Sequence, residues 1–147
     1  MIAYVDSSVI LRKILSQPLA LKEWPLLRSG PVSRLAEVEC LRTFDRLRVE
    51  GILDERRVSA ARESLYRALA SFEVIEVSRT VLSRAAQPTP TALGTLDAIH
   101  LASAMIWRER GGQGVAFATH DEALATAARA NGFRVLGARR AVMTART

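Results

Sequence analysis

Residues 2–8 read Ile2-Ala3-Tyr4-Val5-Asp6-Ser7-Ser8, a short apolar run that stops at an aspartate and two serines. The apolar run predicts a buried strand that ends at Asp6. Ser7 or Ser8 is expected to cap a following helix, because serine oxygens accept hydrogen bonds from the free N–H groups of a first helical turn. Apolar residues at positions 9, 10, 14 and 15 recur at helical spacing. The stretch therefore predicts a strand, a carboxylate and a helix in direct succession.

The same succession recurs near the C-terminus. An apolar run over residues 115–118 reaches Thr119, His120 and Asp121, and an alanine-rich helix follows up to Asn131-Gly132. Other strands are expected at residues 32–33, 74–77 and 133–136. Strands that alternate with helices, joined by crossovers long enough for parallel pairing, predict a three-layer α/β/α sandwich with a mostly parallel central sheet.

Apolar periodicity predicts the remaining helices at residues 34–50, after Asp54 with an apolar stripe from residue 58 to residue 72, at 80–86 and at 96–110. The first two form a helical hairpin that turns at Gly51, and Asp54 is the expected cap of the second helix. The apolar stripe of that second helix faces either the core or a partner subunit. No repeat or linker interrupts the chain, so residues 1–147 are expected to form one domain with a basic tail from about residue 139.

Composition narrows the class of protein. Of 147 residues, 49% are hydrophobic and 24% charged, which is typical of a globular domain. A secretory signal is not expected at a start without a cationic region, and no apolar run approaches the roughly 18 residues of a membrane span. The one cysteine excludes an internal disulfide and a cysteine-rich zinc site. We therefore expect a cytoplasmic protein.

The charge balance points to an acidic partner. The net charge is +6, and of 21 basic residues only Lys13 and Lys22 are lysines. Arginine forms paired hydrogen bonds with phosphates and carboxylates better than lysine does. A polyanion or an acidic protein is an expected partner, and a solvated arginine-rich surface is the alternative. Aromatic residues make up only 5% of the chain, so extensive stacking on bare bases is not expected.

Three aspartates are placed for ligand binding. Asp6 and Asp121 each follow the carboxyl end of a predicted strand, and Asp97 lies in the first turn of a predicted helix. Each alone has a structural explanation, as a helix cap or a favourable charge at a helix N-terminus. A parallel sheet gathers strand ends at one edge, however, and three carboxylates there repel one another unless a cation neutralises them. Oxygen ligands of this kind suit Mg²⁺ or Mn²⁺.

A fourth acid is expected from the first helix of the hairpin, as either Glu37 or Glu39, and helical periodicity leaves the choice open. Either glutamate alone is also explained by an ion pair on its own helix. His100 and His120 can serve in acid–base chemistry or bind phosphate, and we interpret His100 as a packed residue near an apolar helix face. Cys40 is interpreted as a small core residue.

Four sequence blocks resemble the PIN-domain family, in particular the VapC-like ribonuclease toxins of prokaryotic toxin–antitoxin modules. They are Tyr4-Val5-Asp6-Ser7-Ser8, Val32-Ser33 through Val38-Glu39-Cys40-Leu41-Arg42, Leu96-Asp97-Ala98-Ile99-His100-Leu101-Ala102, and Ala118-Thr119-His120-Asp121 with its continuation to Gly132. The third block is the most specific, and together the blocks span nearly the whole chain. Register within the second block favours Glu39 over Glu37, because the family places its acid directly before two leucine-like positions.

The resemblance implies a metal-dependent endoribonuclease that leaves a 5′-phosphate and a 3′-hydroxyl. The acids implied as ligands of one or two Mg²⁺ or Mn²⁺ ions are Asp6, Glu39, Asp97 and Asp121. Ser7 and Thr119 would orient a carboxylate or a water molecule. The family also implies a homodimer, and a cognate antitoxin that enters the cleft and inhibits the enzyme.

The nearby arginines Arg12, Arg42 and Arg46 are expected to hold the RNA backbone. Two other functions are compatible with the pattern. A receiver or phosphatase-like domain would take a phosphoryl group at Asp6, but such folds need a lysine near a later strand end, and neither lysine is placed there. A non-catalytic RNA-binding module would share the fold and the arginine surface, and the intact set of four acids speaks against it.

Overall fold

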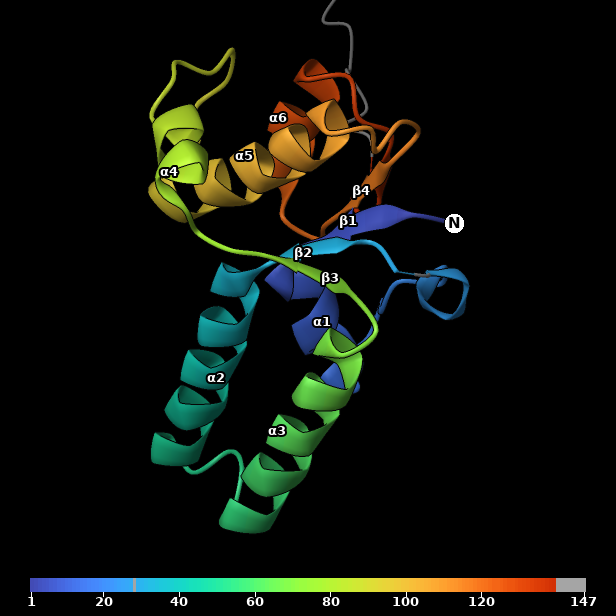
Figure 1. Ribbon diagram of the computed structural model, residues 1–147. Helices are drawn as coiled ribbons and strands as arrows, with labels where there is room; N and C mark the ends of the chain where they lie inside the picture. The colour runs from blue at the N-terminus through green and yellow to red at the C-terminus, as the bar shows by residue number, and fades with distance from the viewer. Residues whose placement is uncertain (28, 140–147) are drawn as a thin grey trace, which may run out of the picture.

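The computed structural model describes residues 1–27 and 29–139, and Figure 1 shows their arrangement. The helices are α1 (Ser7–Ile14), α2 (Arg34–Val49), α3 (Glu55–Leu69), α4 (Arg79–Ala85), α5 (Thr95–Glu109) and α6 (Glu122–Ala130), with a 3₁₀ turn η1 (Trp24–Leu26). The strands are β1 (Ala3–Val5), β2 (Pro31–Ser33), β3 (Glu73–Ile75), β4 (Ala116–Ala118) and β5 (Val135–Leu136). The expected basic tail lies outside the described residues after residue 139.

The predicted α/β class with parallel strands is confirmed. β1 pairs in parallel with β4, and β4 pairs in parallel with β5. β2 and β3 form a second parallel pair, which lies against β1. In Figure 1, α4, α5 and α6 lie on one side of these strands, and α1, α2 and α3 lie on the other. The carboxyl ends of β1 and β4 are therefore adjacent, with Val5 level with Ala118.

The start of α1 differs from the sequence prediction. Its cap is Asp6, whose backbone is extended at φ −79° and ψ 153° and whose carboxylate accepts a hydrogen bond from the Ser8 N–H. Ser7 is already the first helical residue, so the expected serine cap was wrong, whereas the other interpretation, Asp6 as a helix cap, is confirmed. The second helix of the hairpin does start as predicted, because the Asp54 carboxylate accepts a hydrogen bond from the Arg57 N–H at 2.8 Å.

Packing is divided between the two faces of β1. Ala3 and Val5 belong to a core cluster with α1, α2 and α3, whereas Tyr4 belongs to a cluster with α5 and α6. This alternation follows from the two-residue period of a strand. The apolar stripe of α3 packs in the first cluster through Ala61, Leu65 and Leu69, so its buried part faces the core.

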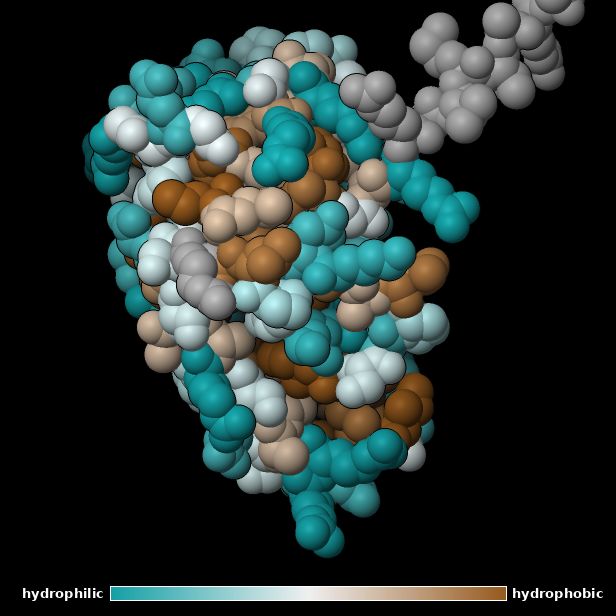
Figure 2. Space-filling model, turned by 90° about the vertical axis from the view of Figure 1, so that its right-hand side faces the viewer, coloured by the Kyte–Doolittle hydropathy of each residue, from teal (hydrophilic) through white to brown (hydrophobic). Residues whose placement is uncertain are grey.

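Some apolar residues remain at the surface. The segment between α1 and β2 lies to the right of the strands in Figure 1 and so faces the viewer in Figure 2, where hydrophobic residues show among hydrophilic ones. Leu19 and Leu26, both in this segment, are 75% and 56% exposed. Among residues 1–27 and 29–139, no helix combines the length and the hydrophobicity that a bilayer crossing requires.

Candidate metal centre

Asp6 lies directly after β1 and is nearly buried, with 4% of its surface exposed. Its Oδ2 atom accepts hydrogen bonds from the Ser8 hydroxyl at 2.6 Å and from the Thr119 hydroxyl at 2.9 Å. Ser8 lies in the first turn of α1 and Thr119 follows β4, so two adjacent segments hold one carboxylate oxygen. The Ser7 hydroxyl lies 3.4 Å from the other oxygen, Oδ1. The carboxylate is thereby fixed in one orientation.

Glu39, on α2, is the glutamate that reaches Asp6. Its Oε1 atom lies 2.5 Å from His100 Nε2, and the same nitrogen lies 3.4 Å from Asp6 Oδ1. One ligand atom from each of these three residues lies within 4.8 Å of the other two. Glu37 instead pairs with Arg34 at 2.8 Å on its own helix. The structure therefore places Glu39, and not Glu37, in the acidic cluster.

His100 joins the acids to the core. The ring is fully buried, and its Nδ1 atom lies 2.6 Å from the Tyr4 hydroxyl. Burial lowers the pKa of His100, but the hydrogen bond to Glu39 and the charges of the acids outweigh burial and raise it overall. The interpretation of His100 as a buried residue is confirmed, but the contact with both acids was missed. The sequence signal that His100 lies near the acids was its spacing from Asp97, which lies three residues earlier on the same helix.

Asp97 and Asp121 extend the negative charge. Burial raises the pKa of Asp97, and the charges of neighbouring carboxylates, chiefly Asp121 and then Asp6, add to bring it to about 6. Asp121 is exposed and caps α6, where its Oδ1 accepts a hydrogen bond from the Leu124 N–H at 2.7 Å. The charges of Asp121, Asp6 and Glu39 therefore all act on Asp97. Among the described residues, however, the ligand atoms that lie within 4.8 Å of one another belong to Asp6, Glu39 and His100, and not to Asp97 or Asp121.

The donor set fits a hard divalent cation. Carboxylate oxygens are the ligands that Mg²⁺ and Mn²⁺ prefer. Burial first, and then the charges of neighbouring carboxylates, raise the pKa of Asp97, and a bound cation would relieve the part that is due to like charges. Asp6 Oδ1 and the Glu39 carboxylate are the groups best placed to ligate it, since Asp6 Oδ2 already accepts two hydroxyl hydrogen bonds.

Several neighbours of the cluster have supporting contacts. The Thr119 hydroxyl also accepts a hydrogen bond from the Asp121 N–H at 3.0 Å, so it connects two of the acids. Ser8, which the sequence suggested only as a cap, accepts a hydrogen bond from the His120 N–H at 3.0 Å. Cys40 is fully buried, as predicted, and burial with the charges of nearby acids raises its pKa to about 12.

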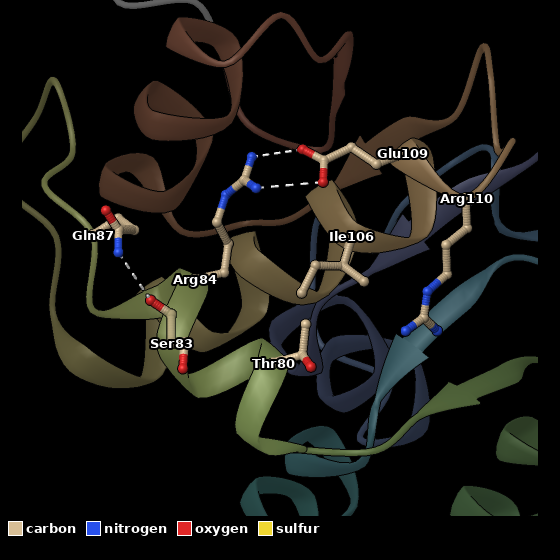
Figure 3. Close-up of a pocket in the computed structure, with 7 residues that line it drawn as sticks. All are labelled: Thr80, Ser83, Arg84, Gln87, Ile106, Glu109 and Arg110. Carbon is tan, nitrogen blue, oxygen red and sulfur yellow. Dashed lines mark hydrogen bonds and ion pairs between the residues drawn. The ribbon is translucent and has the colours of Figure 1, made fainter.

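A hollow of about 700 Å³ lies elsewhere, between α4 and α5 (Figure 3). Arg84 and Glu109 form an ion pair of 2.6 Å across it, beside Thr80, Gln87 and Arg110. None of the acids of the cluster lines this hollow. It is therefore separate from the candidate metal centre.

The family follows from comparison with known proteins. A model of the PIN domain family matches residues 3–130, so the chain belongs to this family, as its sequence blocks predicted. Ribonuclease VapC46 of Mycobacterium tuberculosis (strain ATCC 25618 / H37Rv) is 34% identical over 136 residues, which cover 90% of this chain and 95% of the relative. Ribonuclease VapC47 of Mycobacterium tuberculosis (strain CDC 1551 / Oshkosh) is 30% identical over 138 residues, covering 88% and 92%.

Solved structures share the fold. A toxin–antitoxin complex from Klebsiella pneumoniae contains a chain with a TM-score of 0.59 and 20% identity, covering 84% of this chain and 90% of that chain. A chain in the crystal structure of VapBC2 from Rickettsia felis, bound to a DNA fragment from its promoter, has a TM-score of 0.60 and 12% identity, covering 92% and 97%. At these identities the likeness concerns the fold alone.

Proposed function

We propose that the protein is a metal-dependent endoribonuclease that hydrolyses RNA phosphodiesters and acts as the toxin of a toxin–antitoxin pair. One observation carries the proposal: the carboxylates of Asp6 after β1, Glu39 on α2 and Asp97 on α5 lie close enough that their like charges, together with burial and the charge of Asp121, raise the pKa of Asp97 to about 6. Such a group of carboxylates favours a divalent cation, a cofactor that assists phosphodiester hydrolysis. The ribonuclease names of the two mycobacterial relatives support RNA as the substrate.

The proposed ligands are Asp6 and Glu39, with Asp97 and Asp121 adding negative charge and further oxygens. Mg²⁺ or Mn²⁺ bound there supplies positive charge beside the scissile phosphate and lowers the pKa of a water molecule. The chain itself contributes carboxylate oxygens, which α2, α5 and the segments after β1 and β4 position. RNA is cut to leave a 5′-phosphate and a 3′-hydroxyl.

Three hydroxyl groups hold the Asp6 carboxylate in place. The Ser8 and Thr119 hydroxyls donate to Asp6 Oδ2, which keeps Oδ1 directed toward Glu39. The Ser7 hydroxyl, 3.4 Å from Asp6 Oδ1, is placed to orient that oxygen or a water molecule. Because these hydroxyls come from α1 and the end of β4, the site is built before any ligand arrives.

Arginines on α2, the helix that carries Glu39, are the proposed contacts for the RNA backbone. Arg42 pairs with Asp45 at 3.0 Å and Arg46 with Glu50 at 3.5 Å, and all four side chains are exposed. Exposed ion pairs contribute little free energy, so phosphates can replace these carboxylates as partners. The net charge of +6 favours approach of a polyanion.

The proposed protein partners are an inhibitory antitoxin and a second copy of the chain. Both neighbouring folds come from toxin–antitoxin complexes, which supports the first. Large apolar side chains exposed on the hairpin and its turn include Val38, Val49 and Ile52. Exposed apolar surface of this kind is suited to binding another protein. We expect all these partners in the cytoplasm.

The test is cleavage of a structured RNA by the purified chain with Mg²⁺ or Mn²⁺, with and without a chelator. We expect Glu39→Gln to lower cleavage at least 100-fold and Glu37→Gln, two residues away on the same helix, to leave it unchanged. Cleavage that persists in chelator would overturn the metal-dependent proposal. RNA binding without cleavage by the parent would indicate a non-catalytic module, and a phosphoaspartate trapped at Asp6 would indicate phosphoryl transfer.

A further inference from the structure

A buried hydrogen-bonded chain connects the core to the acidic cluster. The Tyr4 hydroxyl lies 2.6 Å from His100 Nδ1, and His100 Nε2 lies 2.5 Å from Glu39 Oε1. Tyr4 and His100 are both 0% exposed. The chain starts on β1, passes through α5 and ends on α2. β1 directly precedes Asp6, α5 carries Asp97 and α2 carries Glu39.

The direction of the hydrogen bonds follows from their partners. Within residues 1–27 and 29–139, the partners of His100 Nε2 are carboxylate oxygens, of Glu39 at 2.5 Å and of Asp6 at 3.4 Å, so this nitrogen carries a hydrogen in either protonation state of the ring. Burial, and then the charge of Asp6, raise the pKa of Tyr4 well above its ordinary value, so its hydroxyl stays protonated. In the neutral ring, the Tyr4 hydroxyl donates to Nδ1 and His100 donates to Glu39.

The Tyr4 ring is held rigidly. It stacks on Phe117 with 4.9 Å between ring centroids and 29° between ring planes, and it meets the His100 ring edge-on at 6.0 Å. Tyr4 and Asp6 are two residues apart, so the strand periodicity directs both toward the same face. The stacked ring thereby fixes the hydroxyl that contacts His100, close to the end of the strand that precedes Asp6.

We propose that Tyr4 and His100 are positioning residues that hold the Glu39 carboxylate beside Asp6 and so preform the cation site. The Glu39 side chain is 23% exposed, so without the hydrogen bond it can turn toward water and away from the negative charge of Asp6. The inference rests on the proposed function for its biological meaning, but it concerns cation binding and is tested on binding. Partners behind a metal ligand commonly change metal affinity by roughly 10- to 100-fold when removed.

The chain offers a matched pair of variants, because it has two tyrosines. Tyr4→Phe removes one hydroxyl and keeps the stacked ring, whereas Tyr66→Phe makes the same change on the exposed side of α3, where Tyr66 is 46% exposed. Mn²⁺ affinity is measured by electron paramagnetic resonance of free Mn²⁺. We expect Tyr4→Phe to weaken Mn²⁺ binding about 10-fold or more and Tyr66→Phe to leave it unchanged. RNA cleavage by Tyr4→Phe should recover at high Mn²⁺, which a merely structural defect would not do.

A second pair of variants separates positioning from direct ligation by His100. His100→Gln keeps an N–H donor for Glu39, so it should retain more Mn²⁺ affinity than His100→Ala. Equal losses in these two variants, or Mn²⁺ binding by Tyr4→Phe that matches the parent, would overturn the proposal. A parent that binds Mn²⁺ in this Tyr4-dependent way but cleaves no RNA would overturn the proposed function and support the positioning role. A parent that binds no Mn²⁺ would overturn the positioning proposal.

Discussion

Replacing Asp97 by asparagine should stabilise the metal-free protein. The pKa of Asp97 is raised from 3.8 to about 6 by burial and neighbouring carboxylates. A shift of this size is worth about 3 kcal/mol at about 1.4 kcal/mol for each pKa unit. Because the carboxyl is partly exposed, solvent screening reduces the expected effect to about 1–1.5 kcal/mol. For a chain of this length, that raises the melting temperature by about 2–6 °C.

The effect of Asp97→Asn on the melting temperature depends on pH. The folded state favours the neutral acid, so the protonated carboxyl is tolerated at pH 4, and the cost appears as the pH rises through the folded pKa of about 6. Thermal unfolding in chelator should therefore show a higher melting temperature for Asp97→Asn at pH 7.5 and little difference at pH 4. Added Mg²⁺ should stabilise the parent more than the variant, because the variant has lost one negative charge.

The control is Asp45→Asn on α2. The pKa of Asp45 is lowered, first by its hydrogen bond with Arg48, which outweighs the opposing effect of desolvation, so this change should not stabilise the protein at pH 7.5. A lower melting temperature for Asp97→Asn in chelator at pH 7.5 would refute the reasoning. So would an equal stabilisation at pH 4 and pH 7.5, because that would show that charge repulsion is not the cause.

Three further outcomes are expected. In urea titrations, Thr119→Val should lower the free energy of unfolding by about 1–2 kcal/mol, because the Asp6 carboxylate loses a buried donor. The control Thr126→Val, which removes an exposed hydroxyl, should have a much smaller effect. Cys40 should resist iodoacetamide at pH 8 until the chain unfolds, since it is buried and its pKa is raised to about 12; rapid labelling of the native protein would contradict this. Asp54→Ala should cost about 1 kcal/mol in chemical denaturation by removing the cap of α3, and an unchanged midpoint would show that the cap contributes nothing.

The local succession of strand, carboxylate and helix could be predicted from the sequence. The apolar patterns that mark a buried strand and an amphipathic helix each extend over only a few residues. Val5 and Asp6 lie at a strand end as predicted, and the hairpin turns at Gly51, whose φ of +73° favours glycine. Strand ends were less predictable. The last strand contains only Val135 and Leu136, because its extent depends on pairing with β4 rather than on its own apolar run.

The site was harder to derive than the fold. Glu37 and Glu39 lie two residues apart on one helix, and periodicity did not choose between them. The choice is made by α5, which brings His100 against Glu39 and leaves Glu37 to pair with Arg34. Such a contact joins residues 61 positions apart, and no local pattern reports it. The same holds for Ser8, whose hydrogen bond to the Asp6 side chain was masked by its expected role as a helix cap.

Anomalous diffraction from Mn²⁺-soaked crystals tests the central claim most directly. We expect an anomalous peak in contact with the carboxylates of Asp6 and Glu39, within reach of Asp97, and no such peak in crystals of Asp6→Asn. A Mn²⁺ peak that avoids Asp6 and Glu39, or an unchanged peak in the Asp6→Asn crystals, would contradict it.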